Sequence, residues 1–579
     1  MTNADVARQF EEIADLMEIR GDDAFRVNAY RKIARTVEDL AADINDLAAR
    51  NELAGLPGVG KASIEKIREL LSTGKLALRD ELLAEVPAGL LGLRQIQGLG
   101  PKKIAQLWRE RGIDSIDALK TALASNALAG LKGFADKSID NIRRGLDFLA
   151  TAVGRTRLGI AWEIAEQFKQ QLRKVPGVQR IEHAGSLRRG VETVGDIDLL
   201  CIADDGAKVV QAFTKLADPN AILASGDTKG SIRFSYADDR AIQVDLRVVP
   251  AASYGAALQY FSGSKAHNVR LREMAVKRGW SLNEYGLHEG ETQLAGANEE
   301  DIYAKLGLPW MPPELREDRG EFELRETPAD LIDLADIRGD LHMHTTASDG
   351  RCTIEQMIEG AAARGYQYIC ITDHSRSSFV ANGLTIERLK AHIDDVRAAA
   401  AKTKNLTVWV GAEVDILSEG ELDYPDDMLA QLDFVVASLH AGMSQDVKIN
   451  TNRTLRAIQN PYVNLIAHPT GRMINRREAM PLDLETLAAA AAETGTAMEI
   501  NASNFRLDLK DQHARFVRDR GVTICIDCDA HHADQFDQMR FGVMTARRAW
   551  LRKADVLNTR PAAEIQAFVA AKRKKLGVG

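Results

Sequence analysis

The pattern of apolar and polar positions changes along the chain. Residues 1 to about 150 read as short helical stretches between polar turns, whereas helical and strand-like runs alternate from about 155 to 250. A helical segment and short strands follow to about 308. After residue 330, apolar runs of strand length recur regularly, separated by helical stretches such as 354–364 and 482–493. This order predicts a multidomain protein that begins with an all-helical region.

Each apolar run after residue 330 ends in or beside a side chain able to bind a metal ion. The runs end within 340–344, 369–374, 408–413, 435–440, 465–468, 498–501 and 528–531. Strands alternating with helices, with polar residues at the strands' carboxyl ends, are typical of a parallel barrel whose site lies on one face. Because only seven runs are found, we expect a distorted (β/α)7 barrel.

Proline and charge mark a connection between the two halves of the chain. Pro309-Trp310-Met311-Pro312-Pro313 precedes the charged stretch 314–326, and together they predict a linker before a boundary near residue 330. We expect six parts in all. They are helical domains at 1–85 and 86–150, an α+β domain at 151–255, a smaller domain at 256–310, a linker at 311–337 and the barrel at 338–575.

Bulk properties narrow the class of protein. At 579 residues and 63.5 kDa, the length predicts roughly three to five domains of about 100 to 200 residues each. No apolar run approaches the roughly 20 residues that cross a bilayer, and the acidic, amphipathic N-terminus is not signal-like. Five Cys without an even spacing pattern favour a reducing compartment. We therefore expect a cytoplasmic protein that does not enter a membrane.

Cys525 and Cys528 form a lone C-x-x-C pair. Because no second pair completes a tetrahedral zinc site, we interpret them as small apolar residues of a buried strand.

A hydrophobic-x-Gly-hydrophobic-Gly turn followed by a helix occurs twice in the helical region. The two copies carry Gly58, Gly60 and Lys61, and Gly98, Gly100, Lys102 and Lys103. Glycines leave the first amides of the helix approachable, which predicts a phosphate-binding turn. An ordinary Gly-containing helix connection is the alternative, and the second copy and the lysines weaken it. Residues 130–134 are a weaker third candidate.

Three Asp on strand-like segments form a first candidate site. Asp196 and Asp198 lie two residues apart in an apolar run, so both project from one face of a strand, and Asp245 lies in a second run. Clustered carboxylates repel one another unless divalent cations lie between them. Gly185 and Ser186 offer amides and a hydroxyl for phosphates, and Arg189 offers a charged fork. We expect two Mg²⁺ ions and a triphosphate here.

A second candidate site collects ligands from the carboxyl ends of the barrel strands. It comprises His342, His344, Asp349, His374, Glu413, His440, His468, Asp529 and His531. Imidazoles with carboxylates favour Mn²⁺, Zn²⁺ or Fe²⁺ over Mg²⁺ alone, and nine ligands can hold two or three ions. Such a site is suited to hydrolysis, in which a metal-bound water is deprotonated and attacks a phosphorus atom. Arg472 either binds the substrate phosphate or forms a surface salt bridge.

The net charge of −8 is awkward for a protein that contacts nucleic acid, since phosphates need clustered cations. Carboxylates at metal sites lower this total without repelling phosphate, because bound divalent ions invert the local field.

Residues 1 to about 310 resemble the family X DNA polymerases, and DNA polymerase beta in particular, through G-S-L-R-R-G-x-E-x-x-G-D-I-D at 185–198. The resemblance implies helix-hairpin-helix motifs that grip the DNA backbone, and a nucleotidyltransferase palm and thumb. Tyr260, Phe261 and Gly263 match a segment beside the incoming sugar, Asn268 matches a residue that contacts the incoming base, and 283–286 resembles an N-E-Y turn. Gln243 departs from the Arg of the animal enzymes.

The same resemblance aligns Lys66 with a Schiff-base lysine that removes 5′-deoxyribose phosphate, and gives Tyr30 a counterpart. Ala62 and Leu78 stand where the family has supporting lysines. Since a nucleophilic lysine needs its pKa lowered by nearby cations or burial, lyase activity is an open question.

Residues 338 to about 575 resemble the polymerase and histidinol phosphatase (PHP) family, on H-x-H-T-x-x-S-D-G, D-H-S, G-A-E, S-L-H, A-H-P and D-A-H-H in order. In bacterial family X polymerases this resemblance implies 3′-to-5′ exonuclease activity, usually Mn²⁺-dependent. Incision at abasic sites is a second candidate activity.

We therefore expect a monomeric repair enzyme that binds gapped or primed DNA and deoxynucleoside triphosphates, fills short gaps and trims 3′ ends. One alternative is a PHP phosphoesterase acting on a small phosphate ester, with the N-terminal part mainly a DNA-binding module. Another is a DNA-end scaffold with idle sites.

Overall fold

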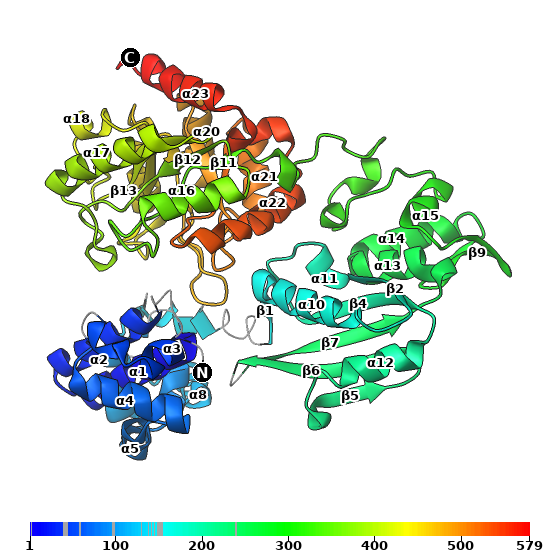
Figure 1. Cartoon of the computed structure of the whole chain (residues 1–579), viewed down its shortest axis with the longest axis horizontal. Helices are drawn as coiled ribbons and strands as arrows, with labels where there is room; N and C mark the ends of the chain where they lie inside the picture. Colours follow the sequence, from blue (N-terminus) through cyan, green and yellow to red (C-terminus); the bar gives the residue numbers. More distant parts are fainter. Residues whose placement is uncertain are drawn as a thin grey trace. The chain divides into compact units, whose positions relative to one another are not determined.

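The computed structural model of the whole chain describes all residues except 2, 39–43, 57, 58, 95, 97, 98, 129, 137, 141, 144, 147–153, 238, 239 and 579. The chain divides into two compact units (Figure 1). Unit 1 comprises residues 1–153 with 475–478, and unit 2 comprises residues 154–474 with 479–579. Among the described residues, no helix is both long and apolar enough to span a membrane.

Unit 1 is helical wherever the structure describes regular elements within it. The helices are α1 (Asn3–Arg20), α2 (Ala24–Glu38), α3 (Ile44–Ala49), α4 (Lys61–Thr73), α5 (Ala77–Glu85), α6 (Gly89–Leu93), α7 (Pro101–Arg111) and α8 (Ile116–Ala124). Helix α1 supplies much of the core, because Phe10, Ile13 and Met17 recur at helical spacing and are fully buried. The predicted helical region is confirmed.

Unit 2 begins with a mixed five-stranded sheet in the order β2-β4-β7-β6-β5. The strands are β2 (Val178–His183), β4 (Asp196–Ala203), β5 (Ile222–Ser225), β6 (Lys229–Ala237) and β7 (Arg240–Val248). Strands β4 and β7 are parallel, and the other neighbours are antiparallel. Helices α10 (Leu158–Leu172) and α12 (Gly206–Thr214) pack on one face, with Leu199 among the buried residues. Helix α13 (Tyr254–Ser262) packs with Leu200 on the other face.

Smaller elements surround this sheet. A two-stranded ribbon pairs β1 (Thr156–Arg157) with β3 (Thr193–Val194), and the short helix α11 spans Gly185–Arg188. After α13 come α14 (Lys265–Val276), the antiparallel strands β8 (Ser281–Asn283), β9 (Gly286–Glu289) and β10 (Thr292–Ala295), and α15 (Glu299–Lys305). Together with the sheet, these elements form the predicted α+β region.

Residues 311–337 are more closely packed than a linker composition predicts. They contain 3-10 turns at Pro313–Leu315, Glu321–Glu323 and Leu334–Asp336. Arg316 is fully buried, and its Nη1 donates to Glu299 Oε1 at 2.7 Å. Glu321 is also fully buried and accepts from the backbone amides of Asp318 and Arg319. The segment is therefore a packed part of unit 2 rather than an extended linker, because its charged side chains are paired inside the protein. The six-part division of the chain stays a prediction.

Seven parallel strands in chain order make up the rest of unit 2. They are β11 (Gly339–Asp340), β12 (Tyr368–Ile371), β13 (Thr407–Asp415), β14 (Phe434–Ser438), β15 (Leu465–Ile466), β16 (Ala497–Asn501) and β17 (Ile524–Asp527). A parallel bridge between Met343 and Ala530 joins the chain just after β11 to the chain just after β17. The sheet therefore closes into the predicted distorted (β/α)7 barrel.

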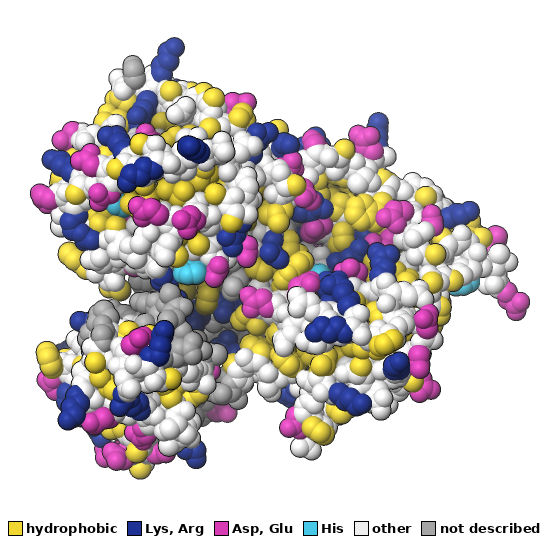
Figure 2. Space-filling view, viewed as in Figure 1, with side chains coloured by type: hydrophobic (Ala, Val, Ile, Leu, Met, Phe, Trp, Pro, Cys, Tyr) yellow, Lys and Arg dark blue, Asp and Glu magenta, His cyan; other side chains and the backbone are white. Residues whose placement is uncertain are grey.

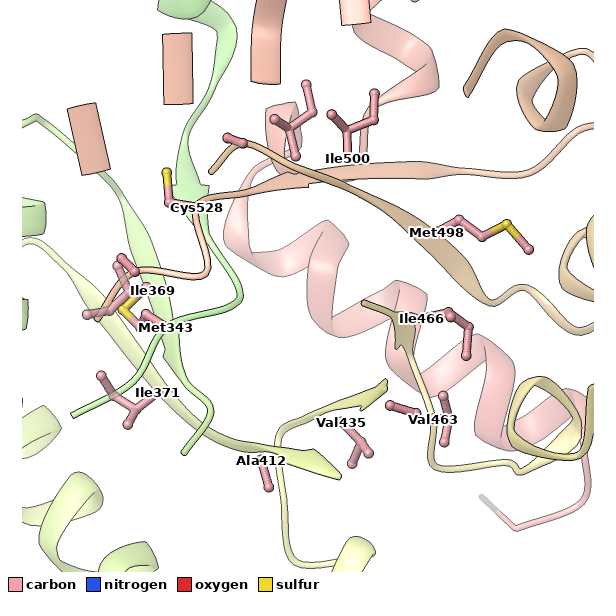
Figure 3. Close-up of a cluster of buried hydrophobic side chains, with 14 of the residues drawn as sticks. Met343, Ile369, Ile371, Ala412, Val435, Val463, Ile466, Met498, Ile500 and Cys528 are labelled. Carbon is pink, nitrogen blue, oxygen red and sulfur yellow. The ribbon is translucent and has the colours of Figure 1, made fainter. Parts of the chain in front are cut away.

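Alternation of side chains gives the barrel two apolar layers. The layer between strands and helices includes Met343, Ile369, Val435, Met498 and Cys528, as Figure 3 shows. It packs against α16 (Ile354–Ala363), α17 (Ile386–Lys402), α19 (Val447–Gln459), α20 (Leu484–Thr494), α21 (Asp511–Arg518) and α22 (Met539–Arg548).

The second layer holds strand side chains such as Tyr368, Trp409 and Cys525, together with Ile565 and Val569 of α23 (Ala562–Lys575). Cys525 and Cys528 thus belong to different apolar layers, and both are buried free cysteines. Cys525 lies in β17 and Cys528 directly follows it, so both are buried small residues at a strand, as interpreted from the sequence.

Candidate active sites

The first candidate site lies where β4 and β7 run side by side. Asp196 and Asp198 share one face of β4, and Asp198 pairs in register with Asp245 on the parallel neighbour β7. This is the face on which Leu200 packs against α13. The parallel pairing brings together carboxylates that are far apart in the sequence, as predicted.

Mutual repulsion is visible in the electrostatics of these carboxylates. Burial, followed by the charges of Asp196 and Asp245, raises the pKa of Asp198 to about 7. Burial and then Asp245 also raise the pKa of Asp196. A divalent cation placed between them would remove this cost, so the residues fit metal binding. The oxygens of the three carboxylates do not all lie within 4.8 Å of one another, in contrast to the ligand groups of the second site described below.

The loop that leads to the carboxylates approaches them closely. Gly185 has φ +66°, and a Cβ built on it would lie 2.8 Å from Asp198 Oδ2. Only glycine therefore fits beside the carboxylate. Ser186 follows half-buried in α11. Gly185, the residue before it, is the one that the structure brings against Asp198.

Arg189 is occupied inside the protein, in contrast to the predicted fork for phosphates. Its Nε donates to Glu317 Oε1 at 3.0 Å, and its Nη1 donates to the Ser262 carbonyl at 2.7 Å. Arg548 donates to both the Arg189 carbonyl and Glu317. Binding of a triphosphate by Arg189 would require these bonds to exchange.

The residues expected near the nucleotide cluster at the end of α13. Asn268 Nδ2 donates to the Tyr260 carbonyl at 2.6 Å, and Gln259 Nε2 donates to Asn268 Oδ1 at 2.7 Å. A Cβ on Gly263 would meet that oxygen at 2.5 Å. The Arg247 guanidinium lies 4.5 Å from the Phe261 ring centroid. Because Arg247 is on the same face of β7 as Asp245, this cluster borders the carboxylates.

The helices that follow the two predicted phosphate turns begin in the same way. Gly60 caps α4 with φ −85°, and Gly100 caps α7 with φ −84°. No heavy atom lies within 4 Å of a Cβ built on either glycine, so both turns are open to a ligand. Gly58 and Gly98 lie outside the described residues.

The lysines beside these turns differ. Lys61 and Lys102 are exposed, whereas Lys103 Nζ donates to Ser138 Oγ at 3.0 Å. Lys66 lies half-buried on α4. The face shown in Figure 2 mixes basic and acidic side chains.

The second candidate site converges on one buried carboxylate. Glu413 Oε2 lies 2.9 Å from His374 Nδ1, 3.5 Å from His342 Nε2 and 3.6 Å from His344 Nε2. Its Oε1 lies 3.0 Å from His468 Nε2 and 3.3 Å from His440 Nε2. Imidazoles gathered around a carboxylate are a donor set suited to divalent transition-metal ions.

The remaining ligands extend this centre on one side. Asp529 Oδ1 lies 3.1 Å from His344 Nε2 and 3.6 Å from His342 Nε2. Asp349 Oδ1 lies 3.5 Å from His374 Nε2 and 3.4 Å from His531 Nε2. All nine predicted ligands are therefore brought together at the carboxyl ends of the barrel strands.

The described residues form three groups in which all ligand atoms lie within 4.8 Å of one another. These are His344-Asp349-His374-His531, His342-His344-Asp529 and His374-Glu413-His440. Buried atoms without a hydrogen-bond partner among the described residues include His342 Nε2 and His344 Nδ1. Since buried polar atoms normally have partners, these atoms fit metal coordination.

Charge also favours cations at this centre. Burial opposes protonation of His440, but Glu413 and Asp415 outweigh it and raise the pKa of His440 to about 10. Burial is outweighed in the same way by Asp349 and Asp529, which raise the pKa of His531 to about 9. The carboxylates thus create a field that holds positive charge, whether protons or metal ions carry it.

The sequence analysis missed residues that orient these ligands. Glu499 Oε1 lies 2.7 Å from His342 Nδ1, and Asp415 Oδ1 lies 2.7 Å from His440 Nδ1. Each leaves Nε2 of its imidazole directed at Glu413, as supporting carboxylates do in metal sites. Glu499 belongs to one of the expected strand ends, and Asp415 lies two residues after Glu413 in β13. The alternation of side chains along a strand could have identified Asp415, because it places Asp415 on the same face of β13 as Glu413.

A cavity of about 590 Å³ opens onto this centre. Its lining includes Asp349, His374, Glu413, His440, His468, Asp529 and His531, together with Arg453, Arg506 and the segment 377–381. Arg506 was also missed. Its Nε lies 3.7 Å from Asp529 Oδ2, and its buried Nη1 has no hydrogen-bond partner among the described residues. A cation at this position is suited to a phosphate group.

Arg472 forms a salt bridge, which was one of the two expected alternatives, but in a largely buried position. It is largely buried, and its Nη2 donates to Glu192 Oε2 at 2.6 Å and to the Leu507 carbonyl at 2.8 Å. It therefore ties the barrel to the region of the five-stranded sheet within unit 2. The expected surface position is wrong, because Arg472 is enclosed by this contact.

Four family models match parts of the chain. They are a helix-hairpin-helix domain at residues 1–76, a SAM-like helix-hairpin-helix tandem at 90–147, the DNA polymerase beta thumb at 257–317 and the PHP domain at 340–503. The models thus match both units.

Curated relatives match whole or in part. The DNA polymerase/3′-5′ exonuclease PolX of Bacillus subtilis (strain 168) is 39% identical over 98% of this chain and 99% of its own length. A probable phosphatase of Thermoanaerobacter sp. (strain X514) is 31% identical over 41% of this chain and 96% of its own length. DNA polymerase lambda of Rattus norvegicus is 28% identical over 54% of this chain and 56% of its own length. Since the match to the first relative spans both candidate sites, the chain belongs to the family X DNA polymerases that carry a C-terminal PHP domain.

Proposed function

We propose that the chain is a DNA-directed DNA polymerase that fills short gaps during repair, with a 3′-to-5′ exonuclease in its barrel. The observation that carries this proposal is the coexistence in unit 2 of the Asp196-Asp198-Asp245 cluster and the Glu413-centred cluster. The two sites have different ligand chemistry, oxygen only in the first and imidazole with carboxylate in the second. Each is therefore suited to different metal ions.

In the polymerase site, Asp196 and Asp198 would hold Mg²⁺ ions, which would in turn bind the phosphates of a deoxynucleoside triphosphate. Bound divalent cations supply charge neutralisation of the transferring phosphate. Asp245 would hold one ion and take part in activating the primer 3′ hydroxyl, and Gln243 Nε2 donates to its two carboxylate oxygens at 3.1 and 3.2 Å. Tyr260, Phe261, Gly263 and Asn268 shape the nucleotide side, and Gly185 and Ser186 lie beside the phosphates.

In the barrel, the nine ligands hold two or three ions, of which Mn²⁺ or Zn²⁺ suit the donor set. Bound ions of this kind supply Lewis acidity and an activated water for phosphodiester hydrolysis. Glu499 and Asp415 keep the tautomers of His342 and His440 fixed. Arg506 neutralises a phosphate oxygen. Cleavage at abasic sites is a further reaction that the same ligands permit.

Gapped or primed DNA is held through the backbone at the turns of Gly58, Gly60 and Lys61 and of Gly98, Gly100, Lys102 and Lys103. Helix amides at Gly60 and Gly100 are suited to phosphate and carry no sequence information. We expect the enzyme to act as a monomer. A cytoplasmic location stays an expectation from the sequence.

Two substitutions test the division of labour. We expect Asp196→Ala to abolish nucleotide incorporation on a one-nucleotide gap and to leave Mn²⁺-dependent degradation intact, and His344→Ala to do the reverse. The assay is run with and without deoxynucleotides. If either substitution removes both activities from a protein that remains folded, the two-site proposal fails.

Lyase activity by Lys66 is a separate question. Lys66 lies in unit 1, and Ala62 of the same helix α4 and Leu78 of α5 offer it no charge. Borohydride trapping of Lys66→Ala on an incised abasic site decides it. Trapping that persists unchanged without Lys66 excludes this lysine.

A second candidate activity is hydrolysis of a small phosphate ester by the barrel. The match of residues in this half to a probable phosphatase over 96% of that protein's length favours it. Turnover of histidinol phosphate against that of a 3′-recessed duplex compares the two. Faster turnover of the small ester would support the phosphatase.

A further inference from the structure

We propose that Arg548 of the barrel is a positioning residue for the polymerase site, because it holds Glu317 while Arg189 turns to the incoming triphosphate. The inference rests on the proposed polymerase function and adds to it a residue from the barrel half of unit 2. It starts from a charged cluster, defined as Arg189, Glu317, Arg319, Asp511 and Arg548, whose ion pairs join the barrel to the region of the five-stranded sheet.

Arg189 lies close to the polymerase carboxylates in the chain but is bound elsewhere. It caps α11, whose first residue, Gly185, lies against Asp198. Its guanidinium donates instead to Glu317 and to the Ser262 carbonyl. A triphosphate beside α11 can therefore recruit the Arg189 side chain only when the ion pair with Glu317 breaks.

Glu317 already has a second cation as partner. Arg548 Nη1 donates to Glu317 Oε1 at 2.8 Å, and the same oxygen accepts from Arg189 Nε at 3.0 Å. Burial opposes the charge of Glu317, but Arg189 and then Arg548 outweigh it and hold the pKa of this carboxyl below its ordinary value. Since a largely buried carboxylate without a partner is costly, Arg548 is the residue that keeps Glu317 compensated when Arg189 leaves.

The charges of the cluster stay balanced through this exchange. Arg548 Nη2 also pairs with Asp511 Oδ2 at 3.0 Å, and Arg319 Nη1 donates to the same oxygen at 3.0 Å. The cluster thus contains three guanidinium groups and two carboxylates. When Arg189 departs, two guanidinium groups remain for the two carboxylates, so the exchange leaves neither Glu317 nor Asp511 unpaired.

The barrel also fixes the backbone from which Arg189 projects. Arg548 Nη1 donates to the Arg189 carbonyl at 2.9 Å. One turn earlier on α22, Met544 lies so close that a Cβ built on Gly190 would be 3.0 Å from Met544 Cβ. Because α22 holds the backbone in this way, the exchange of partners requires rotation of the Arg189 side chain and no movement of the loop.

The test measures single-turnover incorporation on a one-nucleotide gap by the full chain in Mg²⁺, over a series of deoxynucleotide concentrations. The two readouts are the apparent dissociation constant of the nucleotide and the maximal rate. We expect Arg548→Ala to weaken nucleotide binding by about 10- to 100-fold, the range that loss of one hydrogen bond to a charged group gives. The maximal rate should stay close to that of wild type, and Arg548→Lys should recover part of the affinity.

A second substitution separates this positioning role from a merely structural one. Glu317→Gln added to Arg548→Ala should restore nucleotide binding, because the carboxylate that retains Arg189 is then gone. Glu317→Gln alone should bind nucleotide at least as tightly as wild type. Arg547→Ala is the matched control and should match wild type, since the neighbouring Arg547 pairs with Glu314 at 2.8 Å.

Unchanged nucleotide affinity in Arg548→Ala, or no recovery when Glu317→Gln is added to it in a folded protein, would overturn the proposal. Weaker nucleotide binding by Glu317→Gln alone would do the same, and this variant decides the question if Arg548→Ala does not fold. Failure of the polymerase function itself is distinguishable, since the wild-type chain would then incorporate no nucleotide.

Discussion

Gln243 Nε2 donates to both carboxylate oxygens of Asp245, at 3.1 and 3.2 Å. The two residues lie on the same face of β7, two positions apart, so the strand itself aligns them. A neutral amide thus orients the third carboxylate where the animal enzymes of the family use a charged side chain. The carboxylate is held without an ion pair.

Gln243→Leu is expected to slow nucleotide incorporation by about 10-fold, because one hydrogen bond to a charged group is worth about 1.5–3 kcal/mol and solvent replaces part of it. Incorporation is measured by single-turnover kinetics on a one-nucleotide gap. Exonuclease rates serve as the internal control, and a Gln243→Leu enzyme as fast as wild type contradicts the orienting role.

Gly185→Ala should reduce incorporation by at least about 10-fold, since a Cβ would meet Asp198 Oδ2 at 2.8 Å. Gly279→Ala is the matched control. Gly279 also has positive φ, +77°, but no atom lies within 4 Å of its added Cβ. Similar losses in both variants would mean that backbone strain, not crowding of Asp198, is responsible.

Glu299→Gln is expected to destabilise unit 2 by about 3–5 kcal/mol at pH 7, because it leaves the buried charge of Arg316 uncompensated. Burial alone would raise the pKa of Glu299, but Arg316 and Arg188 hold it well below its ordinary value of 4.5. Because the pKa of Glu299 is lower in the folded than in the unfolded chain, its ionised carboxylate stabilises the fold above pH 4.5. This stabilisation is lost as the pH falls further.

The advantage of wild type over Glu299→Gln in urea unfolding should therefore shrink in acid. Glu300→Gln, on the exposed side of the same helix, is the control. A difference that stays constant down to about pH 3 would refute the ion-pair explanation.

Glu413→Gln should lower the metal content of the purified chain by at least one ion and abolish 3′-end degradation. The two oxygens of Glu413 lie near five imidazoles, and these include members of all three ligand groups. Removal of the negative charge of Glu413 should therefore weaken metal binding in each group. Metal is counted by elemental analysis, with the exposed Glu421→Gln as control. Unchanged metal content would remove Glu413 from the centre.

Arg506→Ala is expected to slow DNA cleavage by about 10- to 100-fold with metal content unchanged, since a charge-assisted contact to phosphate is lost. Arg506→Lys should recover part of the rate. Arg520→Ala, whose partner Glu485 lies on the surface, should match wild type. Loss of metal in Arg506→Ala would point to a structural role instead.

Much of the site could be predicted because the chemistry lies at strand ends. The nine barrel ligands and the Asp196-Asp198 pair follow from alternation and residue type alone. Partnerships across the chain were not predictable. Arg189 and Arg472 each lie beside a sequence motif, which suggested phosphate binding. Their ion pairs with Glu317 and Glu192 join residues far apart in the sequence and appear only in the folded chain. The packing of 311–337 depends likewise on Arg316 meeting Glu299, which no local pattern encodes.

The ligands of the barrel centre are drawn from His342 to His531, in the order in which the strands are made. During synthesis on the ribosome, the carboxylates of β4 and β7 are complete long before the last imidazole emerges. A chain that ends early therefore holds the three Asp of β4 and β7 without the complete set of barrel ligands.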